Sequence, residues 1–114
     1  MCKLLFTGLL FCYLANSSQL GVVKNIQAGK LSCAGRLVAP TQFQGWCYKS
    51  GKLVINTVAE FSDADYTWNY SDDSINEIFA GLKWHIYTMP FLADVYWDAE
   101  ITNGANVSTL SGVF

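Results

Sequence analysis

The sequence predicts an all-β protein, a small antiparallel β-sandwich of seven or eight strands. Short runs rich in β-branched and aromatic residues alternate in polarity, and turn residues separate them, which is typical of antiparallel sandwiches and barrels. At 114 residues the chain is short enough for a single domain. Its hydrophobic content of 52% is too high for a disordered chain.

Residues 1–18 have the layout of a secretory signal peptide. Lys3 precedes an apolar run from Leu4 to Ala15, and small polar residues follow. The run is shorter than the roughly 20 residues that a membrane-spanning helix needs. We therefore expect an extracellular protein whose β-sandwich domain is 19–114, with no membrane insertion once the signal peptide is removed. A buried first strand or a short anchor is the alternative interpretation of the apolar run.

Export determines how the cysteines are interpreted. Cys2 and Cys12 leave with the signal peptide, so Cys33 and Cys47 remain as one pair in an oxidising compartment. A disulfide between them would contribute about 3 kcal/mol of stability in the chain-entropy description. A zinc site needs more ligands than the single histidine supplies, and the Cys-x-x-Cys spacing of redox pairs is absent.

The first expected strand covers 22–33, with a bend near Gly29. The segment 36–41 is expected to be a loop, because Gly35 precedes it and Pro40 lies inside it. The strands that follow are expected over 42–48 and 53–61, separated by a turn at 50–51.

Alternation assigns faces to these two strands. In the first of them, Phe43, Gly45 and Cys47 share one face, and the opposite face carries Gln42, Gln44, Trp46 and Tyr48. In the second, one face carries Leu53, Ile55, Thr57, Ala59 and Phe61.

The second half of the chain continues the two-residue period. Strands are expected over 66–70, 82–88, 95–101 and 107–113, and Trp68 and Trp84 lie at alternating positions of the first two. Between them, Ser74 and Glu77 have the spacing of a helix capping box, and Gly81 would end the helix. One short helix there is one interpretation, and a loop is the other.

The charge balance excludes nucleic-acid binding. Removal of residues 1–18 takes away Lys3, so six basic residues remain against nine acids and the formal net charge becomes −3. A basic patch that could bind a phosphate backbone is absent, and we expect no cofactor. Asn69 and Asn106 begin N-glycan acceptor sequences, which matter only in a eukaryotic host.

Few residues could carry catalysis or bind a metal. A small hydrolase could be centred on His85 with Asp94 or Asp98, but no motif places a nucleophile beside the histidine. Acidic residues at 63–65 and 72–73 could bind calcium through carboxylate oxygens, but the spacing of a helix-loop-helix calcium site fails. A solvated acidic loop is the simpler interpretation. We expect no catalytic residues and no metal site.

Aromatic residues suggest a binding surface more strongly. Four tryptophans follow the signal peptide, and a sandwich of this size cannot easily bury all of them. Counting faces along the strands selects Trp46 and Trp84 as exposed, and Tyr48 shares the face of Trp46. These three residues are the predicted ligand- or partner-binding residues.

Several stretches resemble the nematode transthyretin-like family of small secreted proteins. Gly29-Lys30-Leu31-Ser32-Cys33-Ala34-Gly35-Arg36-Leu37 is similar to the family's opening strand, Gly-x-Leu-x-Cys-x-Gly-Lys/Arg-Pro/Leu. Phe43-Gln44-Gly45-Trp46, Asp63-Ala64-Asp65-Tyr66 and Trp84-His85-Ile86-Tyr87 resemble later family motifs at similar spacing. The resemblance covers about half the chain, from Gly29 to Tyr87.

The chain also departs from that family. Tyr66 stands where the family has glycine, the family's cysteine after Ile-Tyr-His is missing, and Cys47 occupies a different place. The family's disulfide therefore cannot be transferred. The fold also includes a purine-pathway hydrolase, whose several histidines and C-terminal Tyr-Arg-Gly-Ser are absent here, which is a reason to expect no enzyme.

The resemblance implies an extracellular sandwich of the transthyretin-like or immunoglobulin-like kind that acts as an adaptor or carries a small hydrophobic ligand. We accordingly expect a secreted binding or adaptor protein whose partner is a protein or a small hydrophobic ligand. The alternative is a secreted inhibitor or effector that acts on a foreign enzyme through a surface loop, either 35–44 or 63–73.

Overall fold

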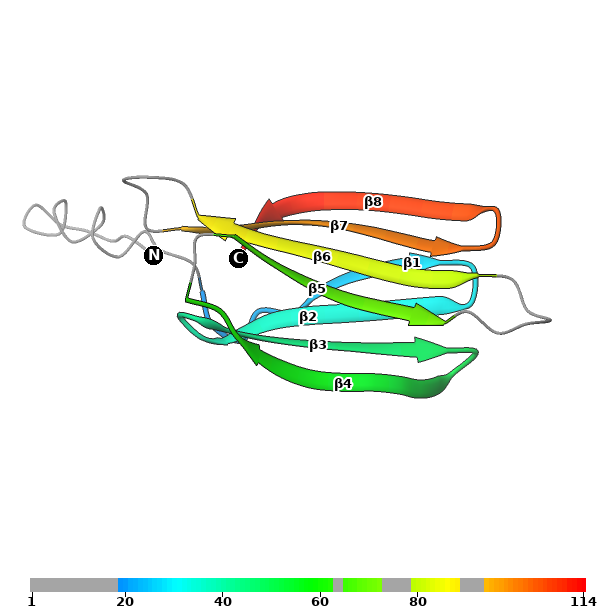
Figure 1. Ribbon diagram of the computed structural model, residues 1–114, viewed down its shortest axis with the longest axis horizontal. Coiled ribbons are helices and arrows are strands. Elements are labelled where there is room, and N and C mark those ends of the chain that lie inside the picture. The colour runs from blue at the N-terminus through cyan, green and yellow to red at the C-terminus, as the bar shows by residue number, and fades with distance from the viewer. Residues whose placement is uncertain (1–18, 63–64, 73–78, 89–93) are drawn as a thin grey trace, which may run out of the picture.

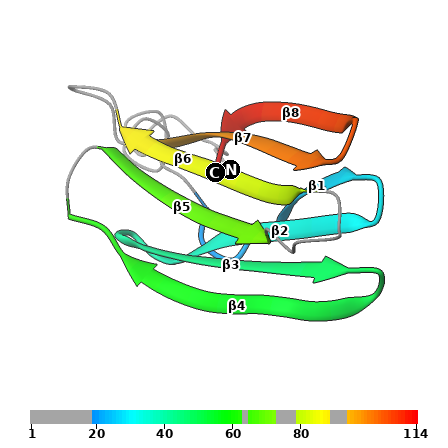
Figure 2. The same ribbon diagram turned by 45° about the vertical axis from the view of Figure 1, so that its right-hand side comes forward.

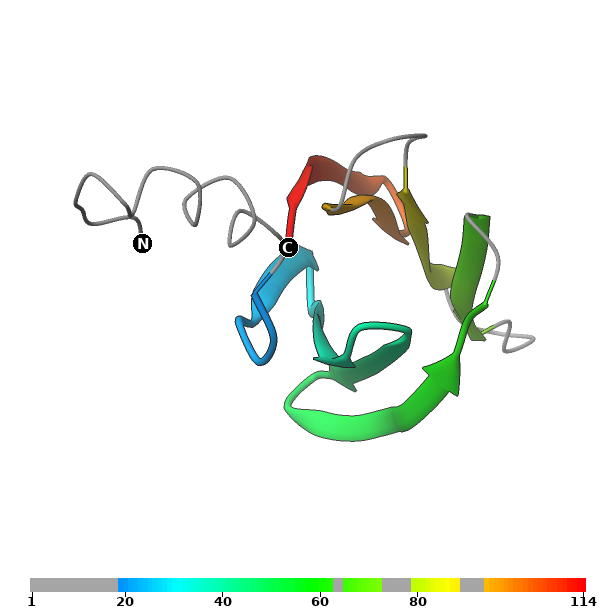
Figure 3. The same ribbon diagram turned by 90° about the vertical axis from the view of Figure 1, so that its left-hand side faces the viewer.

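In the part of the chain that the structure describes, eight strands follow one another, and each pairs with its sequence neighbour within one of two four-stranded antiparallel sheets (Figure 1). The computed structural model describes residues 19–62, 65–72, 79–88 and 94–114. The sheets pack face to face, with β1 against β7 and β8 (Figure 3). The prediction of an all-β antiparallel sandwich is confirmed, and the described residues form eight strands.

Sheet A contains the first four strands in the order β1-β2-β3-β4 (Figure 2). Their bounds are β1 Lys24–Ala28, β2 Leu31–Ala39, β3 Gln42–Lys49 and β4 Lys52–Glu60. Tight turns join them, with Gly29, Ser50 and Gly51 in the left-handed region of φ.

Two expectations for this sheet are wrong. The single strand expected over 22–33 is a hairpin, because Gly29 takes a φ of 58° and reverses the chain instead of bending it. The loop expected over 36–41 is mostly strand, since β2 continues to Ala39 and the turn is confined to Pro40 and Thr41. The glycine at 35 marks close packing inside the sheet and does not end the strand.

Sheet B contains the other four strands in the order β5-β6-β7-β8. Their bounds are β5 Asp65–Asp72, β6 Ala80–Thr88, β7 Val95–Asn103 and β8 Asn106–Val113. The short helix that the capping box suggested falls at 73–78, which lies outside the described residues. Gly81, which would have ended it, belongs to β6.

The core lies between the sheets, and aromatic rings from both sheets pack against one another in it. Gly35 and Gly45 face each other across β2 and β3, and the missing side chains leave room for rings. An ideal Cβ at Gly45 would lie 2.8 Å from the Trp68 ring of sheet B, and one at Gly35 would collide with the Phe43 ring. The paired glycines therefore form the recess into which sheet B inserts its tryptophans.

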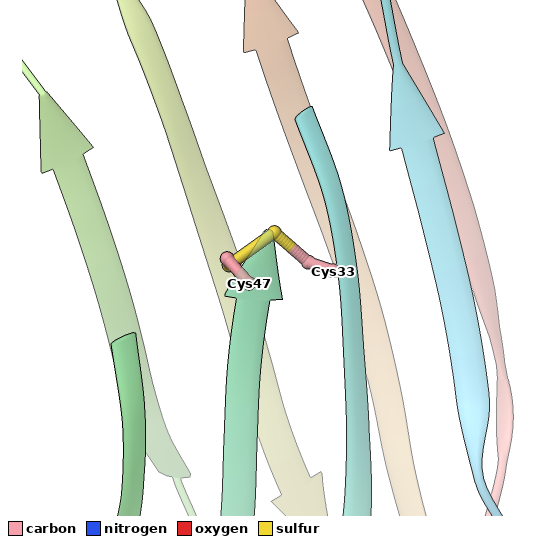
Figure 4. The surroundings of a disulfide bond; sticks show 2 residues. All are labelled: Cys33 and Cys47. Carbon is pink, nitrogen blue, oxygen red and sulfur yellow. A yellow bond between two sulfur atoms is a disulfide. The ribbon is translucent and has the colours of Figure 1, made fainter. Parts of the chain in front are cut away.

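The disulfide lies on the inner side of sheet A. Cys33 and Cys47 are directly opposite each other on β2 and β3, and a bond joins them (Figure 4). Both side chains are buried in the core. The predicted pairing is confirmed, and the bond fixes the register of the β2–β3 hairpin from within.

An ion pair between Lys49 and Asp72 joins the two sheets at an end of the sandwich. Lys49 of β3 donates to the Asp72 carboxylate of β5 at 2.7 Å. Both side chains are largely shielded from solvent, so the pair is screened less than an exposed one. It fixes one end of edge strand β5 over sheet A.

Candidate functional site

The outer face of β3 carries two of the three aromatic residues that the sequence assigned to binding, Trp46 and Tyr48. Phe43, Gly45 and Cys47 are buried against sheet B, as the alternation predicted. The residues between them point away from the core. Trp46 is therefore partly exposed, and 42% of Tyr48 is exposed.

A β-bulge in β4 adds an apolar residue beside Tyr48. The partners of β3 step from Ile55, opposite Cys47, to Leu53, opposite Tyr48, so Val54 is an extra residue in the strand. The expectation that Leu53 shares the inner face of Ile55 is therefore wrong. Leu53 is 48% exposed on the outer face.

A row of hydrogen-bonded polar side chains crosses three strands next to these rings. Arg36 donates from Nε to Gln44 Oε1 at 2.9 Å, and Gln44 donates from Nε2 to Asn56 Oδ1 at 2.9 Å. The Arg36 guanidinium also lies 5.6 Å from the ring centre of Trp46, a cation–π distance. The contacts order these side chains before any partner binds.

Together these side chains form a surface that we call the sheet A patch. It consists of Arg36, Gln44, Trp46, Tyr48, Leu53, Asn56 and Val58. A shallow depression of about 280 Å³ lies within it and is lined by Val23 together with every member of the patch except Val58. Apolar and amide groups predominate, and the single charge is the Arg36 guanidinium.

The other predicted binding tryptophan is in the core. Trp84 has no exposed surface, and its ring centre lies 5.6 Å from Phe43 and 5.1 Å from Trp97. The expectation that Trp84 is exposed is wrong, because its face of β6 is turned toward sheet A. Its neighbour His85 occupies the outer face instead.

His85 lies at the centre of the outer face of sheet B, between two carboxylates. Its Nδ1 is 3.1 Å from Asp98 Oδ2 on β7, and its Nε2 is 2.6 Å from Asp65 Oδ1 on β5. Partial burial lowers the pKa of His85, but the hydrogen bonds and charges of Asp98 and Asp65 outweigh it, so the pKa lies above the ordinary 6.5.

The structure selects Asp98 over Asp94 as the acid that contacts His85. It also adds Asp65, a partner that sequence reasoning missed. Asp65 is 20 residues away in the chain, and only the register of β5 against β6 brings the two together. The only indication in the sequence was its place in the acidic segment that starts at 63.

The glycan acceptor asparagines both lie in sheet B. Asn69 is exposed on β5, and Asn106 is exposed at the start of β8. Neither lies on the sheet A patch. Glycosylation of both residues stays a prediction.

The calcium hypothesis falls partly on residues 63, 64 and 73, which lie outside the described residues. Within the described ranges, no group of three or more acidic, histidine or cysteine side chains is placed to hold a metal ion. The same part of the chain contains no helix with the length and hydropathy of a membrane span.

Comparisons of the chain with known protein families, with curated proteins and with solved structures find no match. The transthyretin-like resemblance therefore stays a prediction.

Proposed function

We propose that this protein is a secreted binding or adaptor module and that the sheet A patch is its docking surface. The observation that supports this most directly is the position of Trp46. In a protein that buries its three other tryptophans, this one lies on the outer face of β3 beside an exposed tyrosine and an exposed leucine. An exposed cluster of this kind is typical of an interaction site.

The composition of the patch favours a protein partner. Tryptophan, tyrosine and arginine are the residues that most often dominate binding energy at protein interfaces, and the patch contains one of each. The bonds from Arg36 through Gln44 to Asn56 reduce the entropy that docking would cost, since three polar side chains are already ordered.

A second form of the proposed function, carriage of a small hydrophobic ligand, is less well supported by the shape of the patch. Sites for small ligands are commonly concave, with volumes of about 300 to 1,000 Å³. The depression in the patch is shallow and lies just below that range at about 280 Å³. A broad contact across the sheet face suits the patch better than enclosure of a ligand.

A role other than catalysis is supported by the position of His85. In the arrangement that the structure shows, both of its ring nitrogens contact carboxylates at hydrogen-bonding distance, so neither is open to a substrate. Secretion and extracellular location are part of the proposal and agree with the buried disulfide.

The test is affinity capture from the extracellular fluid of the source organism, quantified by mass spectrometry. The immobilised folded chain is compared with Trp46→Ala and Tyr48→Ala. The matched control is Tyr96→Ala, which removes a tyrosine from the outer face of sheet B. We expect each patch variant to lose at least tenfold in capture of a specific partner, since a hot-spot truncation costs about 2 kcal/mol or more.

Two outcomes would oppose the proposal. Equal capture by wild type and Trp46→Ala would exclude the patch. Loss of capture in Thr41→Ala, at the tip of the β2–β3 hairpin, with full capture by Trp46→Ala would favour the alternative of an effector that acts through the 35–44 segment.

A further inference from the structure

His85 connects three adjacent strands of sheet B. It stands on β6, and its two carboxylate partners stand on the flanking strands, Asp65 on β5 and Asp98 on β7. Strand β5 is an edge strand of this sheet, and Asp65 is its first residue. We call these three side chains the His85 bridge.

The number of protons on the imidazole decides how many of its two contacts are hydrogen bonds. A carboxylate can only accept, so each contact needs an N–H on the ring. The charged imidazolium has two N–H donors, whereas the neutral ring has one donor and one lone pair. Both contacts are favourable at once only when His85 is charged.

The other groups around His85 do not reverse this preference. On β6, the Tyr87 ring stacks on His85 with 4.9 Å between centres, and Lys83 lies two residues before it on the same face. On β7, Tyr96 stacks on Tyr87, and Glu100 lies opposite Lys83. On β5, the residue directly opposite His85 is the uncharged Thr67.

The two carboxylates differ in how easily they can leave. The Asp65 side chain is 71% exposed at the start of an edge strand, whereas the Asp98 side chain is 50% exposed on a strand paired on both sides. Asp65 can turn its carboxylate into water at the edge of the sheet, whereas Asp98 is held between two strands. Breaking the contact of Asp65 with His85 is therefore expected to cost less free energy than breaking that of Asp98. The Nε2–Asp65 contact is the shorter of the two, at 2.6 Å against 3.1 Å for Nδ1–Asp98, but water can replace it where Asp65 stands. We therefore expect neutral His85 to keep its proton on Nδ1, toward Asp98.

We infer that the His85 bridge is a protonation-dependent fastening of edge strand β5: charged His85 holds both carboxylates, and neutral His85 keeps Asp98 and releases Asp65. The raised pKa of His85 agrees with this geometry. A raised folded-state pKa means that the bridge stabilises the fold fully below the unfolded value of 6.5. The stabilisation is lost as pH rises through the folded value.

The test is an NMR titration of the folded chain, in which His85 is the only histidine and gives a single set of ring signals. We expect a midpoint above 6.5, lowered by both Asp65→Asn and Asp98→Asn. The matched control is Asp94→Asn, which removes the same charge from a residue outside the bridge and is expected to move the midpoint less. Ring ¹⁵N shifts above the midpoint are expected to show the Nδ1–H tautomer.

A second measurement connects the titration to stability. Between pH 5.5 and pH 8, the unfolding equilibrium constant is expected to rise about two- to fivefold in the wild type, the range of exposed charge pairs. His85→Gln, which cannot titrate, is expected to lack that part of the rise. A midpoint at or below 6.5, an Nε2–H tautomer, or an equal pH dependence in His85→Gln would each overturn the inference.

Discussion

The outer faces of the two sheets differ in chemistry although the same alternation of residues forms both. The sheet A patch is aromatic, aliphatic and amide-rich, and its single charge is the Arg36 guanidinium. The outer face of sheet B carries His85 between two carboxylates. One face is therefore suited to docking, and the other to a response to pH. We expect that substitutions can change the two properties separately.

The largest expected effect comes from the residue wrongly assigned to the docking surface. Trp84→Ala removes a fully buried indole that contacts rings from both sheets, so we expect a loss of about 3 to 5 kcal/mol in the free energy of unfolding. Trp46→Ala, on the outer face, is expected to cost less than about 1 kcal/mol. Denaturant unfolding measures both, and similar losses would contradict the division between core and patch.

The disulfide belongs to sheet A, where it joins β2 and β3 on the inner side of the sheet, directly behind the patch. Replacement of Cys33 and Cys47 by alanine is expected to cost about 3 kcal/mol. The loss is to be measured by thermal or denaturant unfolding and compared with the wild type under reducing conditions. In the fraction that stays folded, the His85 titration is expected to be unchanged, since the bridge lies in sheet B. A shifted midpoint would show that the two faces are coupled.

A smaller loss is expected at the glycine recess beneath the patch. Gly45→Ala places a Cβ about 2.8 Å from the Trp68 ring, so the ring must move, at a cost of about 1 to 3 kcal/mol. Gly51→Ala is the control for the glycine substitution itself, since open space surrounds that turn residue and only its φ of 80° opposes a side chain. Unfolding measurements and the near-ultraviolet circular dichroism of the tryptophans report the change. An unaltered aromatic signal in Gly45→Ala would argue against close insertion of Trp68.

The smallest expected effect is that of pH on the capture of a partner. Capture of a partner by the sheet A patch is expected to vary less than twofold between pH 5.5 and pH 8, because the patch contains no histidine and no carboxylate. If capture does depend on pH, the measurement is repeated with His85→Gln. A pH dependence that persists in this variant comes from a partner that itself titrates. A pH dependence that disappears in that variant would show that sheet B takes part in docking.

The sequence predicted local features better than contacts between distant strands. Alternation along β3 correctly separated Phe43 and Cys47 from Trp46 and Tyr48, and the prediction that Cys33 pairs with Cys47 was also correct. Alternation also separated Trp84 from His85, but it could not say which of them faces the core. That choice depends on the recess that sheet A offers.

Two further features depended on pairing between strands. The bulge at Val54 appears only in the register of β4 against β3, so the outward position of Leu53 could not be read from a two-residue period. The contact between Asp65 and His85 depends likewise on the register of β5 against β6. Both errors arise because pairing between strands, and not the strand alone, decides what a side chain meets.

The most direct test of the central claim is hydroxyl-radical footprinting of the chain bound to its captured partner. Trp46 and Tyr48 are accessible in the free protein, and the docking proposal predicts that both become protected from oxidation in the complex. Tyr87 and Tyr96, on the outer face of sheet B, are expected to react equally in both states. Protection of the sheet B tyrosines with unchanged oxidation of Trp46 and Tyr48 would contradict the assignment of the docking surface to sheet A.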